Sequence, residues 1–230
     1  MADQAVTTTI ENNVAVVRFD DGKANALSHA VIDALDGALD LAEKEAGAVM
    51  LVGRPGKFSA GFDLTVMQES PAARRKLVEA GARVGLRLYT FPRPVVAAVT
   101  GHALAAGAVF LCACDYRIGV TGPFKIGLNE VAIGMPLPIF AMELARARLS
   151  KRHLTQAVAQ ARIYDPAGAV DAGYLDEVVE PDAFEQTAME RAAAMAGLPD
   201  PAHRLTKRSL NAAVARHIES TLAEDMDRIG

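Results

Sequence analysis

The spacing of apolar residues along the chain predicts strands that alternate with helices. Apolar residues within 14–19 favour a strand, which Asp20-Asp21-Gly22 would end as a turn. From Ser28, a predicted N-cap, apolar residues recur every three or four positions, as they do in a helix. The uniformly apolar run 48–52 is followed by glycine and proline and is typical of a buried strand.

The same succession repeats toward the middle of the chain. After a glycine-rich loop at 53–61, the pattern predicts helix 72–88, strand 95–99, helix 105–114 and strand 116–120. From Pro138 onward it turns helical, with later helices expected at about 182–197 and 210–229. We therefore predict one α/β core over residues 1–195, with largely parallel strands, and a helical segment over 196–230.

Composition indicates an ordinary folded chain. Of the 230 residues, 51% are hydrophobic and 23% charged, and the net charge is −4, which argues against a broad nucleic-acid surface. Cys112 and Cys114 lie in an apolar run and are expected to be buried free thiols, as in a reducing cytoplasm. The N-terminus shows no signal-peptide pattern, and Thr100-Gly101-His102 interrupts the uncharged run 94–114, which favours a strand and a helix over a membrane span.

Several familiar motifs fail on spacing. Gly53-Arg54-Pro55-Gly56-Lys57 has two residues between its glycines and Phe58 after the lysine, so it is not a nucleotide-binding P-loop. The five histidines show no metal-ligand spacing with one another or with cysteine. No metal site is expected.

Two turns of small residues are of more interest together. Ser59-Ala60-Gly61 lies beyond the strand 48–52, and Ala105-Ala106-Gly107 opens a helix after the strand 95–99. Ligands of α/β sheets gather beyond the carboxyl ends of strands, where backbone N–H groups at a helix N-terminus are free to donate. Two such donors meeting at one oxygen would form an oxyanion hole. Simple close packing remains the alternative explanation for these small residues.

Several blocks of sequence resemble the crotonase superfamily, the enoyl-CoA hydratases and isomerases. They are 57–64 (KFSAGFDL), 94–101 (PVVAAVTG) with 114–118 (CDYRI), 23–27 (KANAL), which is similar to the family's CoA-contacting segment, and 124–134 (FKIGLNEVAIG), which is similar to its active-site segment. The blocks stand in the family's order. The resemblance implies a crotonase-like spiral core of repeated strand–helix units with a helical C-terminal portion.

The resemblance also implies roles for individual residues. The backbone N–H groups of Ala60 and Ala106 would hold the thioester oxygen, and Glu130 stands where the family keeps a catalytic glutamate. The expected substrate and CoA contacts are Lys23, Ala24, Ala26, Lys57, Ser59, Gly61, Phe62, Asp63, Leu64, Gly107 and Val109. The implied partner is an acyl-CoA thioester, and no cofactor beyond the CoA of the substrate is expected.

Two departures from the family pattern bear on the reaction. Val109 occupies the position where family hydratases have a second glutamate, and valine can neither donate nor accept a proton. One carboxylate suffices to isomerise 3-enoyl-CoA to 2-enoyl-CoA, so we predict that reaction. Ala106 stands where glycine is common, and its methyl would narrow the thioester slot. Two alternatives stay open: a hydratase or a different enolate enzyme that borrows a polar group from elsewhere, such as 63–69, and a non-catalytic member that binds acyl-CoA or RNA.

The C-terminal helix carries an apolar stripe that must be covered. Its members are Ala213, Val214, His217, Ile218, Thr221 and Leu222. The chain's own core could cover this stripe. The family resemblance implies instead that another subunit covers it, in a homotrimer or a dimer of trimers. In such an assembly Lys207 and Arg208 would contact CoA phosphates across the interface.

Overall fold

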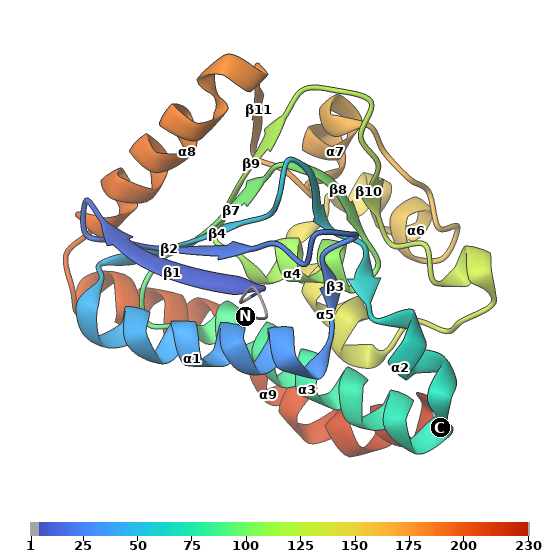
Figure 1. Cartoon of the computed structure of the whole chain (residues 1–230). Coiled ribbons are helices and arrows are strands. Elements are labelled where there is room, and N and C mark those ends of the chain that lie inside the picture. The colour runs from blue at the N-terminus through green and yellow to red at the C-terminus, as the bar shows by residue number, and fades with distance from the viewer. Residues whose placement is uncertain (1–4, 230) are drawn as a thin grey trace.

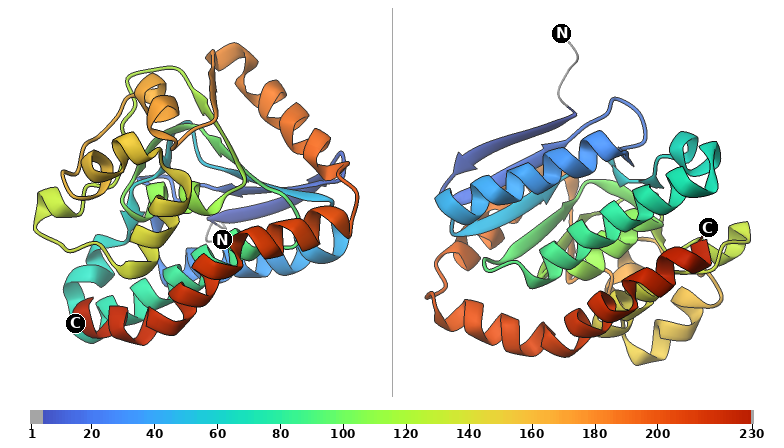
Figure 2. Two further views of the ribbon diagram at one scale, coloured as in Figure 1. Left: turned by 180° about the vertical axis from the view of Figure 1, so that it is seen from behind. Right: turned by 90° about the horizontal axis from the view of Figure 1, so that it is seen from below.

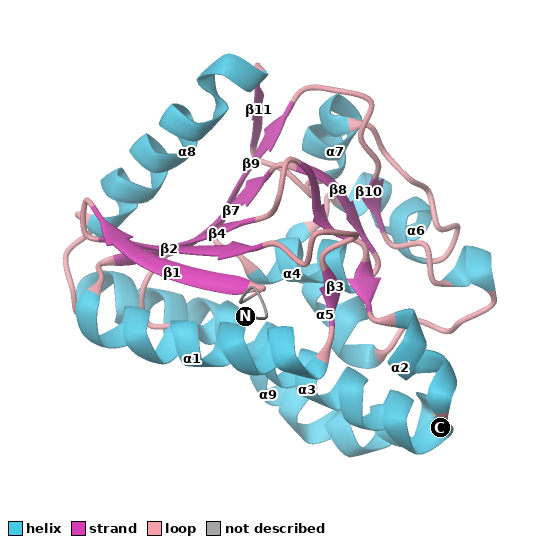
Figure 3. Cartoon of the chain, viewed as in Figure 1, coloured by secondary structure: helices cyan, strands magenta, loops and turns pink. Residues whose placement is uncertain are grey.

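The protein, described here by a computed structural model of residues 5–229, is built around a six-stranded sheet (Figures 1 and 3). Its order is β1 (Val6–Glu11), β2 (Val14–Phe19), β4 (Ala48–Val52), β7 (Val95–Val99), β9 (Tyr116–Val120) and β11 (Glu177–Val179). β1 is antiparallel to β2, and the other neighbours are parallel. This confirms the predicted α/β core with parallel connections. Of the N-terminal segment in which no signal peptide is expected, residues 1–4 lie outside the described part.

Helices cover both faces of this sheet. One face packs against α8 (Pro181–Ala196), which contributes Phe184, Ala188 and Ala192 to a small apolar cluster. The larger core on the opposite face includes α1 (His29–Glu45), α3 (Pro71–Thr90) and α4 (Ala106–Ala113). Each residue of β4 and β7 is buried because these strands are central and covered on both sides, as their uniformly apolar sequences predict.

Two smaller sheets carry the chain from the main sheet to one edge of the molecule. The first has the order β10 (Ile126–Gly127), β8 (Gly101–Leu104) and β5 (Gly56–Ser59), and the second pairs β3 (Ala26–Leu27) with β6 (Gly61–Phe62). Every pairing in both is parallel. As a result, the blocks around 23–27, 57–62, 101–106 and 126–130 lie side by side although they are far apart in sequence.

The chain is mainly helical in its later part, as predicted from Pro138 onward. The helices after β10 are η1 (Val131–Ile133), α5 (Ile139–Arg148), α6 (Lys151–Val158), α7 (Pro166–Ala172), α8 and α9 (Ala202–Ile229), and β11 lies between α7 and α8. α9 lies along α3 and α5, as Figure 2 shows from two sides. Ile218 and Met226 of α9 are buried in the chain's own core, while Ala213 and His217 are exposed, so the core covers only part of the predicted stripe.

Several features of the fold differ from the sequence-based expectation, and the segment 53–61, predicted as a loop, contains the strand β5. β1 and β11 are strands that the apolar pattern did not reveal, because both lie at the edges of the sheet and β11 has only three residues. α9 begins at Ala202 rather than near residue 210, since its first turns leave Leu205 and Leu210 largely exposed and so give no apolar stripe.

The uncharged run 94–114 forms β7, β8 and α4, in agreement with the expected strand and helix. None of the helices within residues 5–229 is long and apolar enough to cross a membrane.

Candidate functional site

A buried hydrogen-bond network holds the 19–26 segment against the start of the 56–62 segment. The Asn25 amide donates to the carbonyls of Phe19 (2.8 Å) and Lys57 (3.2 Å), and the Ser59 hydroxyl donates to the Asn25 carbonyl (2.8 Å). Asn25 takes a left-handed φ of 52° that asparagine tolerates better than most residues. Sequence reasoning missed this structural role of Asn25, although it lies within a recognised block.

Two glycines allow the first small-residue turn to touch the second. Gly61 has a φ of +98°, and a Cβ there would lie 2.8 Å from the Ala105 Cβ. A Cβ on Gly107 would lie 2.5 Å from the Ser59 carbonyl oxygen, closer than real Cβ contacts allow. The N-terminus of α4 is therefore pressed against the 59–61 turn, as the sequence analysis expected for a shared site.

Ala105, just before α4, has a strained backbone. Its φ of 50° and ψ of −127° are unusual for a residue with a side chain and cost of order 1–3 kcal/mol. Its N–H donates to the Gly127 carbonyl (3.1 Å), which ties the turn to β10. Strain held in place by neighbouring structure is common at functional sites, because it sets the direction of a particular peptide group.

The structure corrects the predicted pair of oxyanion donors. The Ala60 N–H donates to the Ala24 carbonyl (3.1 Å) and so is already occupied. Phe62 offers an alternative: the Asp63 N–H donates to the Leu27 carbonyl of β3 (3.2 Å), and successive amides of a strand face opposite edges. The Phe62 N–H consequently faces away from β3.

Phe62 and Ala106 line one cavity together. Gly61, the residue before Phe62, lies close to Ala106, since a Cβ on Gly61 would be 3.3 Å from the Ala106 nitrogen. The pair that fits an oxyanion hole is thus Phe62 and Ala106. The sequence located the two turns correctly but not the amide within the first turn, because spacing does not show which N–H groups are used in pairing.

β10 carries Glu130 to this place. Ile126 and Gly127 pair with Ala103 and Leu104 of β8, so the segment that follows β10 leaves the sheet beside the start of α4. The Glu130 carbonyl accepts from the N–H groups of Ile133 and Met135, each at 3.0 Å, which fixes the tight turn of η1. Glu130 thereby lines the same cavity as Phe62 and Ala106.

The cavity is small and almost entirely apolar. Its volume is about 40 Å³, and its lining residues are Phe62, Met67, Val78, Ala106, Val109, Glu130, Met135, Pro136, Pro138, Phe140, Ala141 and Ile229. Among these residues, all within the described part of the chain, Glu130 is the one with an ionisable side chain. Val109 is 2% exposed and lies one turn after Ala106, so the residue that the sequence resemblance aligns with the second glutamate of family hydratases also lines this cavity.

The surroundings of Glu130 suit a proton carrier. Burial raises the pKa of its carboxyl above the usual 4.5, and backbone N–H groups of Glu130 and Asn129 oppose this in part. Its Oε2 atom is buried and has no hydrogen-bond partner among the described residues. A desolvated carboxylate with a free oxygen is a stronger base than one in water, and it faces an apolar space in which a substrate carbon could lie.

Basic residues gather outside the cavity around β5. The Arg54 side chain donates to the Lys23 carbonyl (2.8 Å). The backbones of Arg54 and Lys57 pair in an isolated antiparallel β-bridge. Lys57 lies opposite His102 in the sheet, and the pKa of His102 is lowered by burial and then by the charges of Lys125 and Lys57. Arg54 is already paired with the Asp20 carboxylate (3.0 Å), so Lys57 and Lys125, whose charges both act on His102, are the cations that could attract an anionic ligand such as a CoA phosphate.

Other predicted contact residues lie in the same turns, some with structural duties. Ser59 is buried in the network with Asn25, and the Asp63 carboxylate caps α2 (Leu64–Glu69) by accepting from the Thr65 N–H (2.8 Å). Leu64 is 66% exposed. Ala24 and Ala26 flank Asn25 and are partly exposed, so they remain candidates for CoA contacts.

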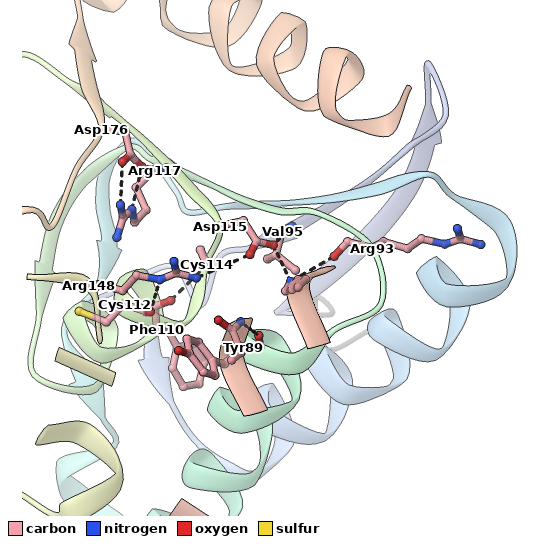
Figure 4. Close-up of polar contacts among 12 residues, drawn as sticks. Tyr89, Arg93, Val95, Phe110, Cys112, Cys114, Asp115, Arg117, Arg148 and Asp176 are labelled. Carbon is pink, nitrogen blue, oxygen red and sulfur yellow. Dashed lines mark hydrogen bonds and ion pairs between the residues drawn. The ribbon is translucent and has the colours of Figure 1, made fainter. Parts of the chain in front are cut away.

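Lys207 does not fit its predicted role in phosphate binding. Its side chain is 5% exposed, and its ammonium contacts the Asp115 carboxylate (2.5 Å) and the Arg93 carbonyl (3.3 Å). Figure 4 shows Asp115 between Val95, Arg93 and Arg148. A charge enclosed in this way is not free to meet a phosphate. Arg208 is exposed and stays a prediction.

No group of three or more His, Cys, Asp or Glu side chains suited to a metal ion occurs within residues 5–229. Cys112 and Cys114 are buried free thiols, as predicted, and burial raises the pKa of Cys112 to about 11.

The chain is similar to known proteins in both sequence and structure. The family described as enoyl-CoA hydratase/isomerase matches residues 9–229. The human mitochondrial enoyl-CoA delta isomerase 1 is 32% identical over 89% of this chain and 70% of its own length. A short-chain-enoyl-CoA hydratase of Clostridium acetobutylicum is 31% identical over 96% of this chain and 86% of that protein. The crystal structure of an enoyl-CoA hydratase/isomerase family protein from Pseudomonas syringae superposes with a TM-score of 0.97 at 38% identity over 100% of both chains.

Proposed function

Because the chain belongs to the enoyl-CoA hydratase/isomerase family, we propose that it isomerises 3-enoyl-CoA to the conjugated 2-enoyl-CoA. The observation that carries this choice is the single carboxylate of the cavity. Glu130 lines it, and Val109 occupies the wall where a second acid–base group would be needed. The name of the human relative, a delta isomerase, supports the same reaction.

In the proposed mechanism the thioester oxygen accepts from the N–H groups of Phe62 and Ala106. Glu130 removes a proton from C2, and the electron pair of that C–H bond delocalises onto the thioester oxygen and toward C4. The resulting dienolate is stabilised by the two donors, whose contribution is typically ~10²–10³ in rate per donor. Glu130 then returns the proton to C4, and the double bond moves from C3–C4 to C2–C3.

The apolar lining supports a proton shift over the addition of water. Hydration needs a water molecule held and polarised beside C3, and the lining residues other than Glu130 are apolar. The segment 63–69, considered as a source of a second polar group, contributes Met67 to the wall, while Asp63 caps α2 and Glu69 is exposed.

The test is Glu130→Gln, assayed with 3-enoyl-CoA for isomerisation and with 2-enoyl-CoA for hydration. We expect isomerisation to fall by ~10²–10⁴, the usual contribution of a general base, while binding of a saturated acyl-CoA changes little. Glu185→Gln, an exposed glutamate on α8, is the matched control. Isomerase activity of Glu130→Gln within tenfold of wild type would contradict the assignment, and dominant hydration by the wild type would contradict the choice of reaction.

A further inference from the structure

Part of the cavity wall comes from four helices, two of which a buried carboxylate links to each other. Met67 of α2, Val78 of α3, Phe140 of α5 and Ile229 of α9 line it. The guanidinium of Arg74 also joins two of these walls, donating to the carbonyls of Met67 (3.0 Å) and Ile229 (3.4 Å). The end of α9 thus forms part of the wall around the space available to an acyl chain.

Asp225 holds this end of α9 in place. α5 begins after Pro138, which provides no side-chain cap, so the first N–H groups of the helix need an acceptor from elsewhere. The Asp225 carboxylate supplies it, accepting from Ile139 (2.6 Å) and Phe140 (2.9 Å) while being 1% exposed. A buried carboxylate bound by two N–H groups at a helix N-terminus is a strong and directional link.

The volume of the cavity limits what can enter. About 10–15 Å³ of such space holds one water-sized group, so the volume of about 40 Å³ holds roughly three or four groups of methylene size. The reacting carbons C3 and C4 take part of it. Little remains beyond C6 before the chain meets Met67 and Ile229.

We infer that this enzyme is specific for short acyl chains of about six carbons or fewer, with Ile229 and Met67 as the stop and Asp225 as the residue that positions it. The inference rests on the proposed function for the identity of the bound thioester. A longer chain would have to displace the Ile229 side chain, which the link between Asp225 and α5 helps to hold in place.

The first test measures binding and needs no turnover. Titration calorimetry with butyryl-, hexanoyl-, octanoyl- and decanoyl-CoA would report Kd as the chain grows. Each methylene buried from water strengthens binding about fourfold, so we expect Kd to fall from butyryl to hexanoyl and then to level off or rise. A Kd that keeps falling about fourfold per methylene to decanoyl-CoA would overturn the inference.

The second test uses variants and the ratio of kcat/KM for 3-decenoyl-CoA to that for 3-hexenoyl-CoA. We expect a wild-type ratio below one tenth, and a rise of at least tenfold in Ile229→Ala and in Asp225→Asn. Asp227→Asn is the control, since Asp227 lies on the same helix but its side chain is 78% exposed. An unchanged ratio in Ile229→Ala, which keeps the link to α5, would overturn the inference even where Asp225→Asn fails to fold.

The two tests separate this inference from the proposed function. Chain-length-dependent binding without isomerisation would refute the proposed reaction and leave the specificity in place. Isomerisation of 3-decenoyl-CoA as fast as that of 3-hexenoyl-CoA would refute the chain-length specificity and leave the proposed reaction in place.

Discussion

Lys207 and Arg208 are adjacent in sequence, and the structure predicts that their loss has different consequences. Lys207 is enclosed beside Asp115, whereas Arg208, the next residue of α9, is exposed. Lys207→Met removes the charge and keeps most of the side-chain volume. It leaves the Asp115 carboxylate without its nearest cation.

The magnitude follows from what remains around Asp115. Removing one partner of a buried ion pair typically costs about 3–5 kcal/mol. Here the Val95 N–H still donates to the carboxylate at 2.8 Å, and an Arg148 nitrogen stays 3.6 Å away. Burial also lowers the pKa of Lys207, against the pull of Asp115, so part of the pairing energy offsets desolvation. We expect the lower end, about 3 kcal/mol, or a fall in Tm of about 6–12 °C for a chain of this size.

The assay is urea and thermal unfolding of Lys207→Met and Arg208→Met, together with calorimetric titration of a short acyl-CoA. Arg208→Met should change the free energy of unfolding by no more than about 0.5 kcal/mol, as for exposed sites generally. Any effect of Arg208→Met should therefore appear in binding. A cost below about 1 kcal/mol for Lys207→Met would refute the reasoning about the buried pair. Weakened binding in Lys207→Met at unchanged stability would restore the role in phosphate binding that the structure argues against.

Three further predictions concern chemistry and assembly. Burial raises the pKa of Glu130 above 4.5, and the base acts when deprotonated, so kcat/KM should fall toward acid with a midpoint above 4.5; a midpoint at or below that value would contradict it. Val109→Glu should raise hydration of 2-enoyl-CoA from a low baseline, whereas wild-type hydration comparable with isomerisation would show that another residue supplies the proton. Light scattering should give a trimer or a dimer of trimers, and a particle of 24.3 kDa alone would exclude both.

The sequence alone determined the strand–helix succession and pointed to the two turns of the candidate site. Central strands such as β4 are apolar on both faces because both faces are covered, and this leaves a clear pattern in the sequence. Edge strands such as β1 leave a weak pattern because half of their surface meets water. Glu130 and Val109 were singled out by the resemblance to the crotonase superfamily, and the difference in their acid–base chemistry is visible in the residue types themselves.

Only the tertiary structure decided which groups are free and which are occupied. The Ala60 N–H is taken by Ala24 and the Lys207 ammonium by Asp115, and both partners are distant in sequence. In the same way, Asp225 caps a helix that begins 86 residues earlier. Local spacing reports propensity and burial, but a hydrogen bond or ion pair depends on where the whole chain brings its partner. The choice of Phe62 over Ala60 as donor therefore had to come from the fold.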